Sequence, residues 1–382
     1  MQLIFIKTYS NIKTLINIIF INAAVLYYII LKKKKVIFFY HPRNQLTKIH
    51  LNYVEELFGI LAKKYIIIYG HTVLGMKNTH YYFIKEGFLK FIFNIKIFIS
   101  NNVCDNFTYK SKKIYIHHDI YDSPLIDPAK KIELVKRLLN YNYLFLPNNK
   151  TVLTFKKYIN AFKNKNKNKK IIKIYDVGYF KLDFLKIKIA KYKTKEDSVV
   201  IALTDTRHIK SMSLIKEIPS LIHLLLRKTN LKIIFRPYPA NRKFKEILEI
   251  TNQFKNYKKF IFDDSDDYFK TYVTSKCLIT DISGTAYTYA FFKKKPIIFF
   301  AKYEKILNKN KFSNLNYFKD RKKVGFISLS QKKTLQLVLN IDKFYNDKKK
   351  SITKLEKEFN YIDKSQIRIT NLIENIYQKI NE

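Results

Sequence analysis

The chain has 382 residues and carries 73 Lys and Arg against 30 Asp and Glu, which gives a formal net charge of +43 at pH 7. Hydrophobic residues make up 47% of it and aromatic residues 16%, enough for sizeable cores, so a globally disordered chain is excluded. Its two cysteines, Cys104 and Cys277, cannot by themselves make a disulfide scaffold or a tetrahedral zinc site. The length is typical of two or three domains.

The positive charge is spread over nearly the whole chain. Lys accumulates together with Ile and Asn in every segment, as it does when codons are rich in A and T, so the charge has to be discounted. Nucleic-acid-binding domains usually concentrate Lys and Arg on one helix or stripe with a recognisable fold signature, which this sequence lacks. We therefore expect no nucleic-acid partner, whereas diffuse Lys charge suits an anionic membrane surface.

An apolar run lies close to the N-terminus, at residues 15–31, and four lysines follow it at residues 32–35. A membrane-spanning helix needs about 20 apolar residues, so the run is of borderline length. The lysines would keep the following domain on the cytoplasmic side. Residues 1–35 are therefore expected to form a membrane-associating segment, an anchor or an interfacial helix, with a buried helix of the first domain as the open alternative.

Short apolar runs alternate with longer amphipathic stretches from residue 36 onward. The expected strands cover residues 36–40, 65–69, 95–100, 113–117 and 143–146, then 171–177, 198–203, 231–235, 259–262, 277–280 and 296–300. The expected helices cover residues 46–63, 129–140, 211–229, 242–254, 267–274, 285–292 and 352–378. Residues 164–170 contain no apolar side chain and indicate a solvated linker.

This alternation predicts an α/β fold of parallel sheets with crossover helices. The two series of strands predict two Rossmann-like, doubly wound domains that face a central cleft, at residues 36–165 and 171–345. Residues 346–382 are expected to form a C-terminal helix. Such folds bind ligands at the carboxyl ends of their strands, so the residues directly after each strand are the candidates for a site.

A His-His-Asp sequence, His117-His118-Asp119, directly follows one expected strand. A His is suited to act as a general base at neutral pH, and a neighbouring Asp can hold an imidazole in one tautomer. The alternative is a pair of His that only bond loop backbone. His41 and His71 also follow expected strands and are candidates to line the same cleft, although most such His are structural. No metal site is expected, because no further Cys or His cluster has ligand spacing.

Two more clusters follow strands of the second series. Arg236, in the sequence Arg-Pro-Tyr-Pro, is placed to bind a phosphate with two hydrogen bonds, and a cap on the sheet edge is the alternative. Asp281, Ser283, Gly284 and Thr285 open an expected helix, whose free N–H groups favour an anion, and ordinary N-capping by Ser283 is the alternative. Further candidates for the cleft are Arg207 and Tyr238, whereas the acidic run 263–267 receives no catalytic role.

Three segments of the second series resemble the CDP-glycerol glycerophosphotransferase family, the teichoic-acid primase and polymerase type. They are residues 178–185, with a glycine-to-aspartate spacing; residues 235–239, similar to a K-P-H-P turn; and residues 277–300, similar to a strand, a T-D-x-S-S segment, a helix and a K-P-I-I-F strand. Order and spacing match over about residues 175–300. The likeness is looser over residues 36–150, where His117 and His118 stand near the family's His-Gly position.

The resemblance implies a GT-B fold with an N-terminal acceptor domain and a C-terminal nucleotide-donor domain. It also implies transfer of a polyol-phosphate unit from a CDP-linked donor to a lipid-linked or glycan acceptor, at the cytoplasmic face of the membrane. No cofactor is expected, because nothing in the sequence requires one. Carried over by position, His118 would be the base that activates the acceptor hydroxyl. Arg236 would belong to the phosphate-binding turn, and Ser283, Gly284 and Thr285 would hold the donor phosphates.

The sequence departs from the family pattern at three of these positions. Tyr238 stands at the place of the family's second His, Asp119 where a Gly is usual, and Gly284 where a Ser is usual. Two alternatives therefore stay open: a GT-B glycosyltransferase that uses a nucleotide sugar to build a surface polysaccharide, and a non-catalytic protein that binds membranes or polyanions. A phosphodiester product indicates the glycerophosphotransferase, and a glycosidic product indicates the glycosyltransferase. Binding that collapses with added salt and does not depend on His118 indicates the non-catalytic protein.

Overall fold

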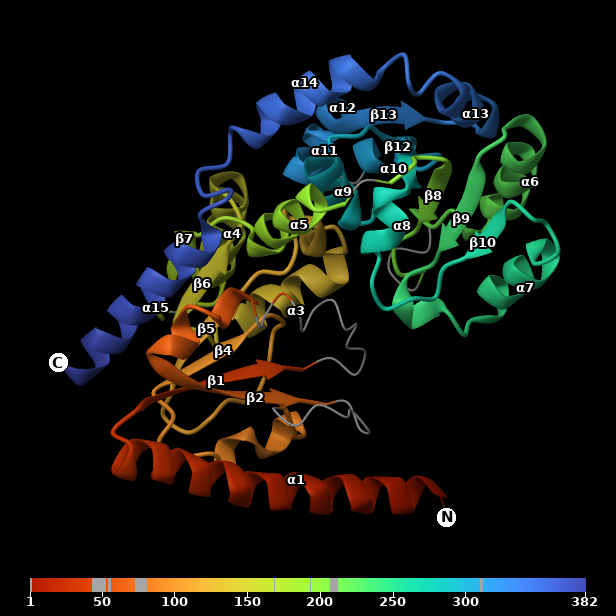
Figure 1. The fold of residues 1–382 in the computed structure, drawn as a ribbon. Helices are drawn as coiled ribbons and strands as arrows, with labels where there is room; N and C mark the ends of the chain where they lie inside the picture. The colour runs from red at the N-terminus through yellow and green to blue at the C-terminus, as the bar shows by residue number, and fades with distance from the viewer. Residues whose placement is uncertain are drawn as a thin grey trace.

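The computed structural model describes residues 2–42, 53, 56–72, 81–167, 169–192, 194–206, 212–309 and 312–382. Within these ranges the chain forms two parallel sheets with flanking helices, one sheet in each half of the molecule (Figure 1). The first sheet has the strand order β3-β2-β1-β4-β5-β6-β7 and the second β10-β9-β8-β11-β12-β13. The expected α/β class with two doubly wound sheets is therefore confirmed.

The first sheet and its helices use the N-terminal half of the chain. Its strands are β1 (Lys35–His41), β2 (Tyr65–His71), β3 (Tyr81–Phe83), β4 (Ile97–Ser100), β5 (Lys112–Ile116), β6 (Tyr143–Leu146) and β7 (Lys173–Asp176). Its helices are α1 (Gln2–Leu26), α3 (Pro128–Leu138) and α4 (Asn149–Lys165). Half of the expected helix at 46–63 falls outside the described residues; in the described half, residues 53 and 56–58 are α-helical and a short 3-10 turn follows at Leu61–Lys63.

The second sheet follows. Its strands are β8 (Ser198–Ala202), β9 (Lys232–Arg236), β10 (Phe260–Phe262), β11 (Ser275–Thr280), β12 (Ile297–Phe300) and β13 (Gly325–Ser328). Its helices are α5 (Phe180–Ala190), α6 (Ile218–Lys228), α7 (Lys245–Phe254), α8 (Phe269–Val273), α9 (Thr285–Lys293), α10 (Glu304–Lys309), α11 (Asn316–Lys319), α12 (Arg321–Val324), α13 (Gln331–Leu339) and α14 (Tyr345–Glu356). The last helix, α15 (Ser365–Asn381), packs on the first domain. Strands such as β12 are buried at every position because helices cover both faces of the sheet.

One strand belongs to a different sheet from the one expected. The run at 171–177 was expected to open the second series, but β7 pairs in parallel with β6 at the edge of the first sheet. After α4 and the lysine-rich stretch, Lys173 donates a backbone hydrogen bond to Asn142 (3.0 Å), and Val177 donates one to Leu146 (2.9 Å). The first sheet therefore extends to Asp176, and the chain crosses to the second sheet through α5. The short strands β3 and β13 were not expected from the sequence at all.

The expected final helix at 352–378 is two helices, α14 and α15, joined by a turn. The carboxylate of Asp183 on α5 accepts hydrogen bonds from the backbone N–H of Asp363 (2.8 Å) and Ser365 (3.0 Å), and Asp363 adopts a left-handed conformation with φ 65°. Gly178, with φ 79°, leaves room for this turn, because a Cβ there would lie 2.9 Å from the Cβ of Ser365. The glycine-to-aspartate segment thus docks the start of α15, which returns to the first domain (Figure 1).

Helix α1 lies along the outside of the first domain and continues as a π-helical turn, Tyr27–Leu31. Asn17 donates a hydrogen bond to the carbonyl of Phe83, and Asn22 donates one to the carbonyl of Phe91, both at 2.9 Å. Residues 8–31 are long and apolar enough to cross a membrane by length and composition. Several apolar side chains on the face away from the domain are exposed, among them Ile19 (69%) and Phe20 (61%).

A candidate active site between the two domains

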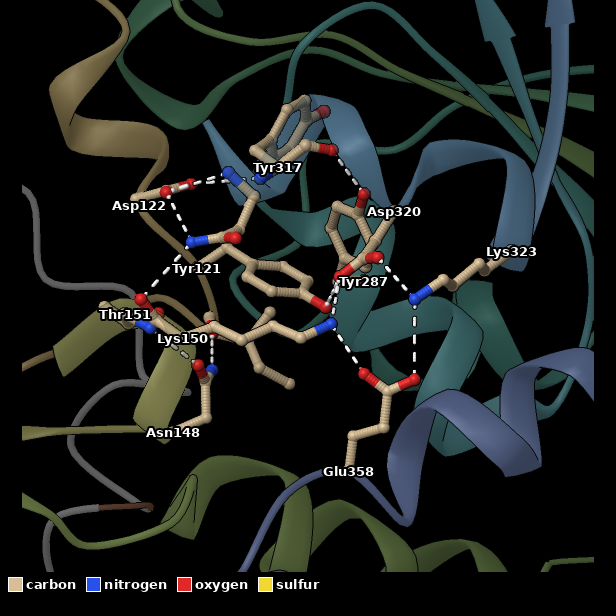
Figure 2. Close-up of polar contacts among 12 residues, drawn as sticks. Tyr121, Asp122, Asn148, Lys150, Thr151, Tyr287, Tyr317, Asp320, Lys323 and Glu358 are labelled. Carbon is tan, nitrogen blue, oxygen red and sulfur yellow. Dashed lines mark hydrogen bonds and ion pairs between the residues drawn. The ribbon is translucent and has the colours of Figure 1, made fainter. Parts of the chain in front are cut away.

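The loop after β5 reaches across to the second domain (Figure 2). The carboxylate of Asp122 accepts hydrogen bonds from the backbone N–H of Asn316 (2.9 Å) and Tyr317 (3.0 Å) at the start of α11. The hydroxyl of Tyr121 donates to Asp320 at 2.7 Å, and its ring packs on the ring of Tyr287 with centroids 4.4 Å apart. These contacts hold the residues just before them, His118 and Asp119, at the domain boundary.

Salt bridges extend this interdomain contact. Lys150 on α4 pairs with Asp320 (2.8 Å) and with Glu358 (2.6 Å), and Lys323 pairs with the same two carboxylates (Figure 2). The hydrogen bonds from Lys150, Tyr121 and Lys323 lower the pKa of Asp320 although burial opposes them. The carboxylate of Asp320 is therefore charged at neutral pH and ties the two domains together.

The two neighbouring His have different surroundings. His117 is buried; its Nε2–H donates to the carbonyl of Tyr121 and its Nδ1 accepts from the hydroxyl of Tyr115, both at 3.0 Å. Because both ring nitrogens are bonded inside the core and burial lowers its pKa, His117 is a neutral structural residue. His118 is only half-buried, and its backbone carbonyl accepts a hydrogen bond from the hydroxyl of Tyr179.

The hydrogen bond at Nδ1 sets the tautomer of His118. Its Nδ1 lies 3.0 Å from the carbonyl oxygen of Asn101, which can only accept, so Nδ1 carries the proton and Nε2 keeps its lone pair. The side chain of Asn101 bonds Nδ1 of His41 at 2.7 Å. Asn101, which sequence reasoning missed, therefore links His41 to His118 across the carboxyl end of the first sheet, and this arrangement suits a general base.

His41 and His71 are neighbours at the ends of β1 and β2, where they pair in register. Both are 2% exposed, and His71 packs edge-on against the rings of Tyr81 and Phe83. Burial lowers the pKa of His71 to about 4, so it is neutral at physiological pH. Both residues thus lie at the expected edge of the sheet, but as buried side chains behind it.

The structure brings the first and third predicted clusters together. Asp119 follows β5 of the first domain, and its carboxylate lies against Gly284, which directly precedes α9 of the second domain. An ideal Cβ at residue 284 would come within 2.8 Å of the Cγ of Asp119. Ser123 donates a hydrogen bond to the same carboxylate and holds it in place. The His-His-Asp turn and the candidate phosphate-binding turn therefore meet at the domain boundary, through Asp119 and Gly284.

The residues at the start of α9 differ in whether their side chains already make hydrogen bonds. Ser283 makes no side-chain hydrogen bond to any described residue, so its hydroxyl is available to a ligand, whereas Thr285 shares a hydrogen bond with Tyr272 at 2.7 Å. Asp281 is 1% exposed and accepts from the backbone N–H of Thr204 (2.9 Å) and Ile282 (2.6 Å). Burial raises the pKa of Asp281 to about 6. Ser283 is thus a half-buried member of the cluster whose hydroxyl is not engaged by the described residues, and buried Asp281 supports the turn from behind.

The guanidinium of Arg236, expected to bind a phosphate, is already bonded to other residues of the second domain. It forms a buried salt bridge with Asp263 at 2.7 Å and donates to the hydroxyl (3.1 Å) and carbonyl (2.9 Å) of Ser265. The acidic run thus serves as its partner, and Asp267 in that run accepts from the backbone N–H of Phe269 (2.8 Å) in the first turn of α8. Tyr238 lies half-buried after β9, and Arg207 lies outside the described residues.

Two residues of the α5 segment also lie at the candidate site, and the sequence analysis assigned them no role. The hydroxyl of Tyr179 donates to the backbone carbonyl of His118 (3.0 Å) and lies 3.4 Å from the hydroxyl of Thr288 on α9, which ties His118 to the second domain. Lys181, two residues later, is half-buried beside the rings of Tyr53 and Tyr268. Among the described residues no group of three or more His, Cys, Asp or Glu could hold a metal ion.

No protein-family model and no curated protein matches the chain. The solved structures it resembles include the wall teichoic acid polymerase TagF, at TM-score 0.64 and 17% identity over 96% of this chain and 99% of that one. A TagF variant soaked with CDPG matches at TM-score 0.62 and 16% identity, with 98% of each chain covered. The S. aureus MnaA–UDP structure matches at TM-score 0.60 and 11% identity, over 91% of this chain and 98% of that one. At these identities the likeness establishes the fold, and the chain has the GT-B architecture expected from its sequence.

Proposed function

We propose that the chain is a transferase that moves a glycerol-phosphate or related polyol-phosphate unit from a CDP-linked donor to a hydroxyl of a lipid-linked or glycan acceptor in cell-surface polymer synthesis. The observation that carries this proposal is the meeting of the His118-Asp119 turn with the start of α9 across the domain boundary. A general base beside a helix N-terminus is the pairing that phosphoryl transfer to a hydroxyl requires. The motif resemblance and the TagF-like fold support the same reading.

The proposed reaction is an in-line displacement at the β-phosphorus of the donor. The acceptor hydroxyl attacks while Nε2 of His118 takes its proton, a new O–P bond forms, and the bond to the bridging oxygen breaks, so that CMP leaves with that oxygen and its negative charge. The carbonyl of Asn101 keeps Nδ1 protonated and thus keeps Nε2 basic. Such catalysis consists mostly of positioning and of charge stabilisation.

The second domain is proposed to hold the donor phosphates. The hydroxyl of Ser283 is available as a donor, and the N-terminal end of α9 carries a partial positive charge. Asp119 occupies the space in front of Gly284, so the phosphates would lie beside that carboxylate. Arg236 is assigned a positioning role, because its hydrogen bonds go to Asp263 and Ser265.

We place the protein at the cytoplasmic face of the membrane as a peripheral protein. Support comes from the exposed apolar side chains of α1, such as Ile19 and Phe20, together with the high positive charge. The hydrogen bonds from Asn17 and Asn22 to the first domain favour a helix that lies in the interface, because spanning the bilayer would break them.

A second candidate function is a glycosyltransferase that uses a nucleotide sugar. The MnaA–UDP structure and a Methanocaldococcus jannaschii UDP-GlcNAc 2-epimerase in complex with UDP-GlcNAc and UDP share the fold at TM-scores of 0.60 and 0.59; the epimerase is 13% identical, over 89% of this chain and 99% of that one. Tyr238 at the place of the family's second His also favours this alternative. The same phosphate site would then hold the leaving nucleotide, with attack at the anomeric carbon.

Ligand-induced thermal stabilisation with CDP-glycerol, CMP, UDP and UDP-sugars at physiological salt tests the proposal. A ligand at 100 times its Kd adds about 2.7 kcal/mol of stability. Stabilisation by cytidine ligands, followed by phosphodiester product from CDP-glycerol that is lost in His118→Ala and kept in His223→Ala, is the expected result. His223 is an exposed residue of α6 and serves as the control. A preference for uridine ligands with a glycosidic product moves the assignment to the second candidate, and no response to any nucleotide rejects both.

A further inference from the structure

A lysine without a carboxylate partner lies in the space between the domains. Lys181 is in the first turn of α5, and its ammonium lies 5.4 Å from the ring centroid of Tyr53 and 5.0 Å from that of Tyr268. The hydroxyls of these two tyrosines are 3.2 Å apart, so the rings form one continuous aromatic wall. Within the described residues, Lys181 makes neither a hydrogen bond nor a salt bridge.

The carboxylates around Lys181 are engaged by other groups. Asp267 pairs with Lys188 at 2.9 Å, Asp263 pairs with Arg236 at 2.7 Å, and Asp119 accepts a hydrogen bond from Ser123. Asp119 and Asp267 act on Lys181 only at longer range, where Arg236 opposes them. The ammonium is therefore surrounded by fixed charges but contacts none of them.

Other lysines of the second domain with little exposure are arranged differently. Lys293 and Lys295 pair with Glu196 at 2.9 and 2.7 Å, and Lys294 pairs with Glu356. A buried cation is costly unless it is paired, and these three follow that rule. Burial lowers the pKa of Lys293 and Lys294, and their glutamate partners oppose that effect. Lys181 has no such salt bridge with a described residue, and burial lowers its pKa to about 8, so the cation is still mostly charged at neutral pH but poorly stabilised by the protein.

We propose that Lys181 is a ligand-binding residue that contacts a phosphoryl group of the bound donor, with the Tyr53–Tyr268 wall holding its side chain toward the start of α9. The nucleotide part of this assignment rests on the proposed function, whereas the ligand chemistry, a phosphate or pyrophosphate, rests on the geometry of Lys181 itself. A bound phosphate would supply the direct contact with a negative charge that no described residue supplies to Lys181. Lys181 would then act together with His118 and Ser283 at the same bound donor.

The competing explanation is that Lys181 is a structural cation–π contact. Removing the charge separates the two, because Lys181→Met keeps an unbranched side chain that can pack on both rings. A structural lysine would lose stability on this change. A ligand-binding lysine would leave the melting temperature of the free protein unchanged or higher, because an unpaired charge no longer has to be desolvated.

The test is isothermal titration of the full chain with inorganic pyrophosphate and with CDP at physiological salt, for wild type, Lys181→Met, Lys181→Arg and Lys191→Met. Loss of one charge-assisted contact should weaken both ligands by about tenfold or more in Lys181→Met. Lys181→Arg keeps the charge and should recover most of the affinity. Lys191 is an exposed lysine at the end of α5 and is the matched control, expected to stay within about twofold of wild type.

The outcomes distinguish this inference from the proposed function. Pyrophosphate binding that depends on Lys181, without tighter binding of CDP, supports the assignment of Lys181 as a phosphate-binding residue and contradicts the proposal of a CDP-linked donor. CDP binding that is unchanged in Lys181→Met, or a lower melting temperature without any change in pyrophosphate affinity, overturns the assignment of Lys181. No binding of pyrophosphate to the wild-type protein overturns it as well.

Discussion

The carboxylate of Asp119 occupies the space at the domain boundary that a side chain at Gly284 would need, since an ideal Cβ at residue 284 would approach the Cγ of Asp119 to 2.8 Å. Relative to the family pattern that this sequence resembles, residue 119 has gained a side chain and residue 284 has lost one. Because the two positions face each other, the gain and the loss compensate. We infer that the two departures are one coupled change.

Gly284→Ser alone is therefore expected to destabilise the protein by about 1–3 kcal/mol, since it overpacks a closed contact. In Asp119→Gly the space is open, so adding Gly284→Ser to that variant should cost much less. Chemical denaturation of the four proteins measures the coupling, expected at about 0.5–3 kcal/mol. Strictly additive free energies of unfolding would show that the two residues are independent.

Substitution of the two adjacent His should affect different properties, activity for His118 and stability for His117. His118→Asn is expected to lower kcat by about 10²–10⁴ with little change in stability, because it removes a general base at a half-buried position. His117→Ala should instead lower stability by about 1–3 kcal/mol, since it leaves the buried groups of Tyr115 and Tyr121 without partners. Initial rates and melting temperatures of both variants provide the check. A His117 variant that is stable but inactive would reverse the assignment.

The sequence was sufficient for the fold because each central strand is an apolar run that helices cover on both sides. Position in the sequence alone could not choose between His117 and His118, and only the family resemblance favoured His118, because both directly follow β5 and the packing of Tyr115 and Tyr121 is what separates them. The role of Arg236 also depended on a distant residue, since its partner Asp263 lies 27 positions further along the chain.

Lys181 is a second case in which the local sequence did not reveal the surroundings of a side chain. It stands inside a segment that sequence analysis recognised, and the glycine and aspartate of that segment, Gly178 and Asp183, dock α15. Nothing in the local pattern reports that Tyr53 and Tyr268, which are far apart in the sequence, meet at its ammonium. Strand β7 was assigned to the wrong sheet for a similar reason, since the side on which a strand pairs depends on long-range packing.

Asp281 should make stability depend on pH in the direction opposite to a salt-bridged carboxylate. Burial raises its pKa in the folded protein to about 6, above the value of about 3.9 for an unfolded chain. The folded state therefore holds more protons between these values, and stability falls as the pH rises from about 4 to about 6, by about 2–3 kcal/mol. Urea denaturation at several pH values should show this contribution as the difference in slope between wild type and Asp281→Asn. Equal slopes would contradict the raised pKa.

The interdomain contact at Asp320 should be sensitive to loss of its charge. Asp320→Asn leaves Lys150 and Lys323 with Glu358 as their remaining carboxylate and weakens the bond from Tyr121, so we expect a loss of about 1–3 kcal/mol. The pKa of Asp320 is lowered in the folded protein, so its stabilisation is present above about pH 4 and is lost as the pH falls further. Asp347→Asn, at an exposed position, is the control. Identical melting temperatures for both variants would show that this contact does not hold the domains.

The exposed face of α1 is expected to mediate binding to membranes. Ile19→Glu combined with Phe20→Glu places two charges on side chains that are 69% and 61% exposed, so the fold should be unaffected while the apolar contact with lipid is lost. Co-sedimentation with vesicles that contain anionic lipid should fall by at least about tenfold, because each buried apolar side chain contributes about 1.5–3 kcal/mol. Ile171→Glu alters an equally exposed side chain, at 79%, in the segment just before β7 and should bind vesicles like wild type. Binding that falls only with added salt, and not with the α1 substitutions, would assign the membrane contact to diffuse charge instead.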